Sequence, residues 1–181
     1  MMVILGAQSL LGNVLIKKLS NENFNYLVLV DEDSSTEKEW LEDIQYWHQV
    51  SDADSLDWVE ENAEEIEFII CCSPVTNDAR LAQFVSLWNL GYQHQIPVIG
   101  VGKSEKEVKE IISTEQSPFF WIILLLQEFY DPYKNEQKST ESSSTQQLTS
   151  LTEVAEAIYY FIRNRQNSGV RTIESALSLL P

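Results

Sequence analysis

Residues 6 to 12 of the chain read Gly6-Ala7-Gln8-Ser9-Leu10-Leu11-Gly12. The short apolar run Val3 to Leu5 precedes them, and leucines at helical spacing follow at positions 11, 15 and 19. This order predicts a buried strand, a tight turn and a helix. Such a turn needs a glycine at its start, and close packing of the helix on the sheet needs one at its end. Gly6 and Gly12 meet these needs.

Apolar strands and helices alternate along the rest of the chain. We expect further strands and helices at the following places: strands at Tyr26–Val30, Gln45–Val50, Glu67–Cys72, Ile96–Val101, Trp121–Leu126 and Val170–Ile173, and helices at Glu37–Asp43, Ser55–Ala63, Asn77–His94, Ser104–Ser113 and after Ser150. Continuous apolar strands separated by helices are typical of a parallel sheet that is covered on both faces. The sequence therefore predicts an α/β fold with a doubly wound parallel sheet of the Rossmann type, with about six or seven strands. Val3–Leu5 should be central, between Tyr26–Val30 and Glu67–Cys72.

The length of 181 residues suits one domain, which we expect to span the whole chain. One segment interrupts the alternation of strands and helices. Residues 139–147 read STESSSTQQ, which contains no apolar side chain to bury. We therefore expect a flexible loop at about residues 135–149.

The formal net charge is −16, and most of it comes from one part of the chain. Between Asp31 and Glu67, fifteen acidic residues face a single lysine, Lys38. Such a surface repels nucleic acids and anionic membranes, and we interpret it as a solvated face, although a basic protein partner is an alternative. No apolar run approaches the roughly 20 residues of a membrane span, and the first residues lack the positive charges of a secretion signal. We expect a cytoplasmic protein.

Metal binding is not expected. The only cysteines, Cys71 and Cys72, are adjacent within an apolar run, and the two histidines, His48 and His94, lie far apart. Neither pair has the spacing of a zinc site, and the cysteines are interpreted as small buried residues.

The turn at residues 6–12 is a candidate site for a nucleotide. The N-terminus of a helix presents unpaired N–H groups and a positive dipole end, both of which favour a pyrophosphate. Asp31 follows the second strand, where a carboxylate accepts hydrogen bonds from ribose hydroxyls and repels a 2′-phosphate. No Lys or Arg stands near Asp31 in the sequence, so NAD is preferred over NADP. Alternatively, Asp31 only opens a turn.

The chain resembles the extended and atypical short-chain dehydrogenase/reductase superfamily, in particular its nucleotide-sugar epimerase and dehydratase branch. The stretch GAQSLLG is similar to GATGFLG of that branch at four of its places. Looser similarities follow in the same order as in the family: EFIICCSP, NLGYQHQIPVI, WIILLLQEFYDP and LTEVAEAIYYFI. The resemblance implies a Rossmann core and a dinucleotide cofactor.

Several departures from the family bear on activity. Ser9 replaces the middle glycine, which lets the backbone approach the pyrophosphate, so only modest affinity is expected. The family's catalytic Tyr-x-x-x-Lys is missing, because the string Val101-Gly-Lys-Ser-Glu105 carries valine and glutamate in its place. Neither residue can replace a tyrosine that exchanges a proton beside an ammonium group. The family's arginine after the sixth strand is also absent, and the substrate-binding lobe is reduced to the polar loop.

Two other tyrosines have a basic residue at the required spacing. Tyr130 and Lys134 flank Pro132 in a turn-like segment, which does not set their side chains one helical turn apart. Tyr159 and Arg163 have helical spacing, but arginine does not deprotonate readily, and we interpret this pair as structural. No catalytic residue is assigned.

The candidate cofactor-binding residues lie at the ends of the first strands and in the first turn. They are Gly6, Gln8, Ser9, Leu10, Leu11, Gly12, Asp31, Asp52 and Cys72. Three hypotheses stay open: a dinucleotide-binding regulator or partner without catalysis, an active NAD(P)-dependent reductase or epimerase with a non-standard site, and a scaffold that binds no nucleotide. Homodimerisation and a complex with another protein are both compatible with the sequence.

Overall fold

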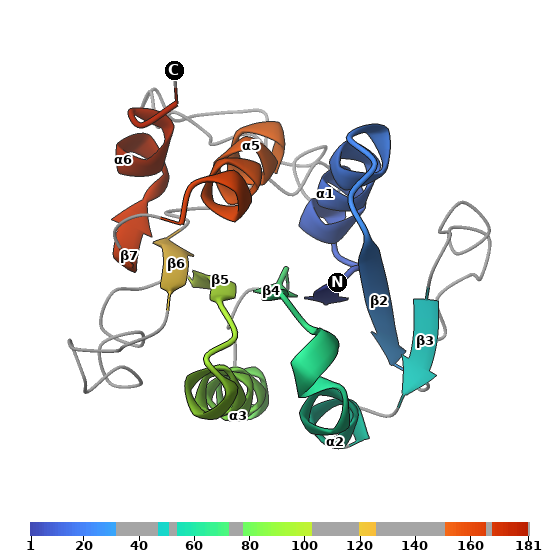
Figure 1. Cartoon of the computed structure of the whole chain (residues 1–181). Helices are drawn as coiled ribbons and strands as arrows, with labels where there is room; N and C mark the ends of the chain where they lie inside the picture. Colours follow the sequence, from blue (N-terminus) through green and yellow to red (C-terminus); the bar gives the residue numbers. More distant parts are fainter. Residues whose placement is uncertain are drawn as a thin grey trace, which may run out of the picture.

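A computed structural model describes residues 1–31, 47–50, 54–72, 78–102, 120–125, 151–165 and 168–180 of the chain. Strands and helices alternate in it (Figure 1). The strands are β1 (Met2–Leu5), β2 (Tyr26–Asp31), β3 (Trp47–Val50), β4 (Phe68–Cys71), β5 (Val98–Gly102), β6 (Trp121–Leu125) and β7 (Gly169–Thr172). The helices are α1 (Leu10–Asn21), α2 (Asp54–Glu61), the 3-10 turn η2 (Ala63–Glu65), α3 (Asp78–His94), α5 (Leu151–Arg163) and α6 (Ile173–Leu177).

The seven strands found among the described residues form one parallel sheet in the order β3-β2-β1-β4-β5-β6-β7. β1 is central: Met2 pairs with Tyr26 of β2 on one side and with Phe68 of β4 on the other. The predicted Rossmann-type sheet and the central position of its first strand are confirmed. The order reverses between β1 and β4, which is the topological switch point of a doubly wound sheet.

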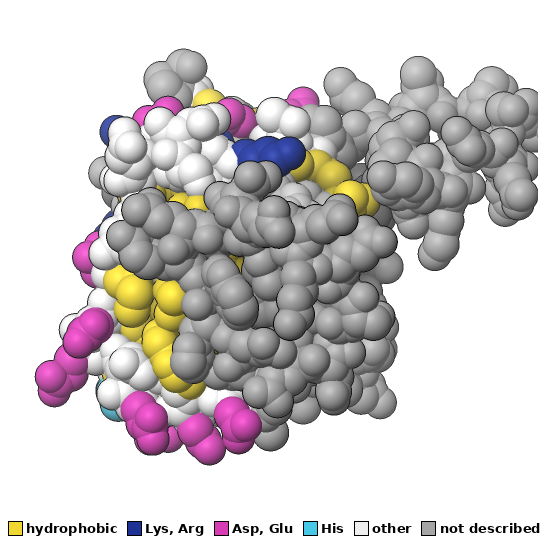
Figure 2. Space-filling view, turned by 90° about the vertical axis from the view of Figure 1, so that its right-hand side faces the viewer, with side chains coloured by type: hydrophobic (Ala, Val, Ile, Leu, Met, Phe, Trp, Pro, Cys, Tyr) yellow, Lys and Arg dark blue, Asp and Glu magenta, His cyan; other side chains and the backbone are white. Residues whose placement is uncertain are grey.

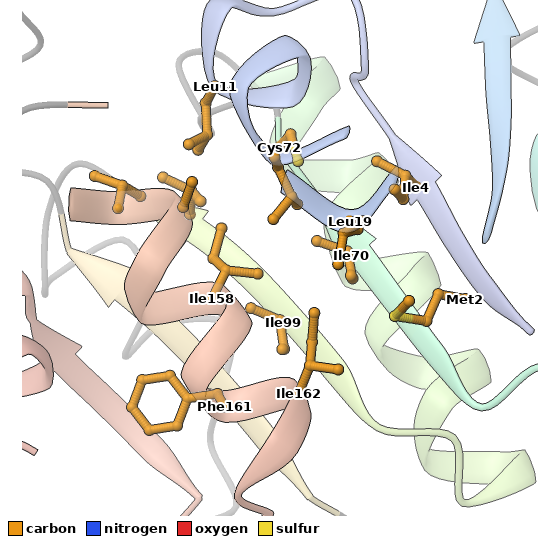
Figure 3. Packing of buried hydrophobic residues seen from close by; sticks show 14 of the residues in the cluster. Met2, Ile4, Leu11, Leu19, Ile70, Cys72, Ile99, Ile158, Phe161 and Ile162 are labelled. Atoms are coloured by element: carbon orange, nitrogen blue, oxygen red, sulfur yellow. The ribbon is translucent and has the colours of Figure 1, made fainter. Parts of the chain in front are cut away.

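Helices cover both faces of the sheet. On one face, α1, α5 and α6 pack on alternate residues of the strands, such as Ile4, Ile70 and Ile99 (Figures 1 and 3). On the other face, α2 and α3 pack on the intervening residues, such as Val3 and Ile69 (Figure 1). Because both faces are buried, the strands consist of continuous apolar residues, and β1, β4, β5 and β6 are buried throughout.

Element boundaries differ from the expected ones by a few residues. The helix expected at Ser55–Ala63 is divided into α2 and η2, and the expected strand Val170–Ile173 starts at Gly169 and ends at Thr172. α6 was not expected from the sequence. Its first turn is capped by Thr172, whose Oγ1 accepts a hydrogen bond from the Ser175 amide at 3.2 Å. The helices expected at Glu37–Asp43 and Ser104–Ser113, and the polar loop at about 135–149, lie outside the described residues.

Acidic side chains gather on α2 and η2. From Asp54 to Glu67, through α2 and η2, every Asp and Glu side chain is exposed: Asp54, Asp57, Glu60, Glu61, Glu64, Glu65 and Glu67. Acidic side chains gather along the lower edge of the face in Figure 2. Among the described residues, no helix is long and apolar enough to cross a lipid bilayer.

Candidate functional site

The carboxyl ends of β1 and β4 meet beside the switch point, and the candidate residues of the turn gather there. β1 ends at Leu5 and continues through Gly6 into α1, while β4 ends at Cys71 and continues into Cys72. The Cys72 amide donates a hydrogen bond to the Leu5 carbonyl at 2.9 Å, which keeps the two strand ends together. In open α/β sheets, ligands bind in the crevice outside the strands at this point.

Gly6 and Gly12 have the structural roles expected of them. Gly6 has a φ of 69°, in the left-handed region that glycine adopts without strain. A Cβ at Gly12 would lie 2.5 Å from both the Cα and the carbonyl oxygen of Ala7. The start of α1 thus packs directly on the backbone of the turn, and glycine at position 12 permits this approach.

Ser9 is the N-cap of α1, and its hydroxyl takes part in two hydrogen bonds within the protein. The Oγ accepts from the Gly12 amide at 3.0 Å and donates to the Cys72 carbonyl at 3.2 Å. The backbone at Ser9 is extended, with φ −68° and ψ 156°, a conformation open to any residue. Ser9 therefore ties the turn to the end of β4.

Two amides in the first turn of α1 make no hydrogen bond within the described residues. The Ser9 amide donates to the Gly6 carbonyl, and the Asn13 amide makes the first bond of the helix, to the Ser9 carbonyl. Within the described part of the chain, the amides of Leu10 and Leu11 donate to no protein group. The Leu10 side chain is 41% exposed, whereas Leu11 is buried in the core under the turn (Figure 3).

The two cysteines are buried, as the sequence predicts. Burial raises the pKa of the Cys71 thiol to about 12. Burial, and to a smaller extent the neighbouring Cys71, raises the pKa of the Cys72 thiol well above its ordinary value. Both sulfurs thus stay protonated thiols near neutral pH and are poor nucleophiles. Cys72 faces the site through its backbone carbonyl, while its side chain belongs to the core (Figure 3).

The remaining candidates are only partly brought together. Asp31 is the last residue of β2, where it pairs with Val50 of β3, so its backbone lies at the same edge of the sheet as Gly6. Gln8 lies in the turn and is partly buried. Asp52 lies outside the described residues. The structure thus places the turn and the Asp31 backbone at the same edge of the sheet.

The described ends of β5 and β6 carry no group suited to proton transfer. Val101, which stands in place of a tyrosine in the resemblance drawn from the sequence, is a residue of β5 and only 1% exposed. Gly102 ends β5, and the buried Leu124 and Leu125 end β6. Val101 is therefore a core residue of β5.

Tyr159 and Arg163 belong to the packing between α1 and α5. The Lys18 ammonium lies 4.3 Å from the centre of the Tyr159 ring, and the Arg163 guanidinium lies 5.2 Å from it on the same helix. Lys18 also pairs with Glu156 at 2.7 Å, and the ring of Phe24 packs edge-on against Tyr159. Both side chains thus take part in the packing of α5 against α1 and Phe24. Tyr130 and Lys134 lie outside the described residues.

No cluster of three or more His, Cys, Asp or Glu side chains that could hold a metal ion occurs in the described ranges of the chain.

The fold is shared with solved structures of low sequence identity. UDP-glucose 4-epimerase of Thermus thermophilus, solved in complex with NAD, matches 95% of this chain and 76% of its own, with a TM-score of 0.68 at 11% identity. The chain has the fold of the nucleotide-sugar epimerases. The enzyme WbmG of Bordetella bronchiseptica, solved with NAD and UDP, matches 98% of this chain and 76% of its own, with a TM-score of 0.67 at 10% identity.

A third example is a nucleoside-diphosphate-sugar epimerase of Staphylococcus aureus, with a TM-score of 0.68 at 14% identity over 95% of this chain and 70% of that one. No family model matches the sequence, and no curated protein does. The expected Rossmann core of the epimerase type is therefore confirmed at the level of the fold, although the sequence is only 10–14% identical to these three proteins.

Proposed function

We propose that the chain binds a dinucleotide, NAD in preference to NADP, and that it does not turn the cofactor over. The observation that carries this proposal is the turn at the switch point. There Gly6 and Gly12 allow α1 to start close to β1, and the amides of Leu10 and Leu11 remain available for a phosphate. The similar structures solved with NAD support the choice of ligand.

The preference for NAD rests on Asp31. Its backbone ends β2 beside the turn, the position from which a carboxylate accepts hydrogen bonds from the adenosine ribose. A 2′-phosphate at the same place would meet this negative charge within a strongly acidic protein, with a formal net charge of −16.

The absence of turnover rests on the described ends of β5 and β6. Val101, Leu124 and Leu125 are buried and apolar, so none of them can donate or accept a proton. The role that we propose is therefore that of a dinucleotide-binding regulator or assembly partner.

Calorimetric titration with NAD and NADP tests binding, with native mass spectrometry to detect cofactor carried through purification. We expect NAD to bind in the micromolar to millimolar range and NADP to bind more weakly. Asp31→Asn keeps the shape of the side chain and serves as the matched variant, in which the preference for NAD should shrink. Absence of binding at millimolar concentration would favour the hypothesis of a scaffold without nucleotide.

A second measurement separates binding from catalysis. The protein is incubated with NAD and a panel of UDP-sugars, and both the absorbance of reduced nicotinamide and the sugar products are followed. We expect no change above the rate without protein. Turnover that disappears in Tyr130→Phe would instead support an active epimerase or reductase with a non-standard site.

A further inference from the structure

We infer that the Ser9 hydroxyl is an internal partner of the turn that lowers its affinity for a diphosphate. This inference rests on the proposed function. Its basis is the pair of hydrogen bonds that join Ser9 Oγ to the Gly12 amide at 3.0 Å and to the Cys72 carbonyl at 3.2 Å. The hydroxyl thereby occupies an N–H group that glycine at position 9 would leave open to a ligand.

The chemistry of a hydroxyl limits what Ser9 can offer to a phosphate. A serine side chain has one proton to donate, and here that proton goes to the Cys72 carbonyl. One lone pair of the oxygen receives the Gly12 amide, so that only a further lone pair remains. A phosphate oxygen near this atom therefore gains no donor and meets another acceptor.

A phosphate that uses the Gly12 amide must displace the hydroxyl. Displacement also releases the hydrogen bond to Cys72, because both bonds depend on the same rotamer of Ser9. The protein thus contributes two amides, those of Leu10 and Leu11, without rearrangement, and the third only at the loss of two internal hydrogen bonds. A ligand that uses the Gly12 amide therefore binds more weakly, because the two hydrogen bonds of Ser9 are lost.

The effect is specific to the phosphate part of a ligand. Ser9 lies in the turn between β1 and α1, beside the switch point. Asp31 lies at the end of β2, which is separated from the switch point by β1. Ligands with a diphosphate, such as NAD and ADP, should therefore be sensitive to the Ser9 hydroxyl, and adenosine should not.

The test compares Ser9→Ala with the wild type by calorimetric titration with NAD, ADP and adenosine. Loss of the hydroxyl frees the Gly12 amide, and one additional hydrogen bond to a charged phosphate corresponds to roughly tenfold tighter binding of NAD and ADP. Adenosine should bind equally to both proteins. Ser9→Thr, which keeps the hydroxyl, is the matched control and should bind like the wild type.

The stability of each variant is measured in the same preparations. If Ser9→Ala does not fold, Ser9→Gly takes its place, since glycine at an N-cap lowers helix stability by only a few tenths of a kcal/mol. NAD binding to the variant that is no tighter than to the wild type overturns the inference and leaves the proposed function intact. Absence of NAD and ADP binding in every protein, at millimolar concentration, overturns both.

Discussion

Replacing Gly12 with alanine tests whether α1 starts in contact with the backbone of the turn. In a helix without such a contact, alanine is more favourable than glycine by about 1 kcal/mol, so Gly12→Ala would stabilise the protein. In this structure the new Cβ would lie 2.5 Å from Ala7 Cα and 2.7 Å from the Ala7 carbonyl carbon. Both are backbone atoms of a turn that Ser9 ties to β4, so they cannot yield as a flexible side chain would. Helix propensity and the clash with the Ala7 backbone thus predict changes of opposite sign in the free energy of unfolding.

Overpacking of this kind lowers the free energy of unfolding by about 1–3 kcal/mol, and the contact with backbone atoms puts Gly12→Ala near the upper end. After subtraction of the gain in helix propensity, we expect a net loss of about 2 kcal/mol. For a protein of this size, such a loss lowers Tm by roughly 4–8 °C. Urea and thermal unfolding measure it.

The control is Lys17→Gly at an exposed position in the middle of the same helix, which measures the effect of helix propensity alone. We expect its free energy of unfolding to fall by less than about 1 kcal/mol. A Gly12→Ala protein as stable as the wild type, or more stable, would refute the close packing of α1 on the turn.

Three further predictions follow from the same structure. Asp31→Ala should weaken NAD binding by about tenfold, because the hydrogen bonds to a charged acceptor are lost, and it should not weaken NADP binding, because the 2′-phosphate no longer meets the carboxylate. Calorimetric titration measures both affinities, and equal weakening of both cofactors would contradict the role of Asp31. Burial raises the pKa of the Cys71 thiol from 9.0 to about 12. Above pH 9 the thiol therefore ionises in the unfolded chain but stays protonated in the folded one, so the free energy of unfolding should fall as pH rises. Urea unfolding should show a loss of up to about 1.4 kcal/mol per pH unit, and Cys71→Ala should remove this part of the pH dependence. Lys18→Met removes the 2.7 Å ion pair with the partly exposed Glu156. We expect the free energy of unfolding to fall by less than about 1 kcal/mol, and this difference between variant and wild type should vanish at high salt. A difference that persists at high salt would point to packing instead.

The sheet could be predicted from the sequence because its strands are buried on both faces. β1, β4, β5 and β6 are continuous apolar runs, which set them apart from the amphipathic helices between them. α6 was missed, since five residues carry too little periodicity. Its only local sign was the pair Thr172 and Ser175, with the spacing of a capping interaction.

The site could be predicted only in part. Gly6 and Gly12 were identified because a strand precedes them and a helix follows. The role of Ser9 as N-cap was visible in principle, as serine is among the preferred residues there. The contact between Ser9 and Cys72 was not, because it joins residues 63 positions apart and exists only once β1 and β4 are neighbours. Tertiary contacts of this kind leave no trace in local spacing.

The central place of β1 also bears on the order in which the chain folds. β1, α1 and β2 are local to one another, and this unit can form as soon as the chain extends to Asp31. The other edge of β1 stays open until Phe68 to Cys71 are present, since β4 is its second partner. Until then β1, an interior strand of the finished sheet, has an exposed edge of the kind that pairs with other chains. Parallel pairing over such separations is slow, so refolding from denaturant should be slow and aggregation at this stage should rise with protein concentration.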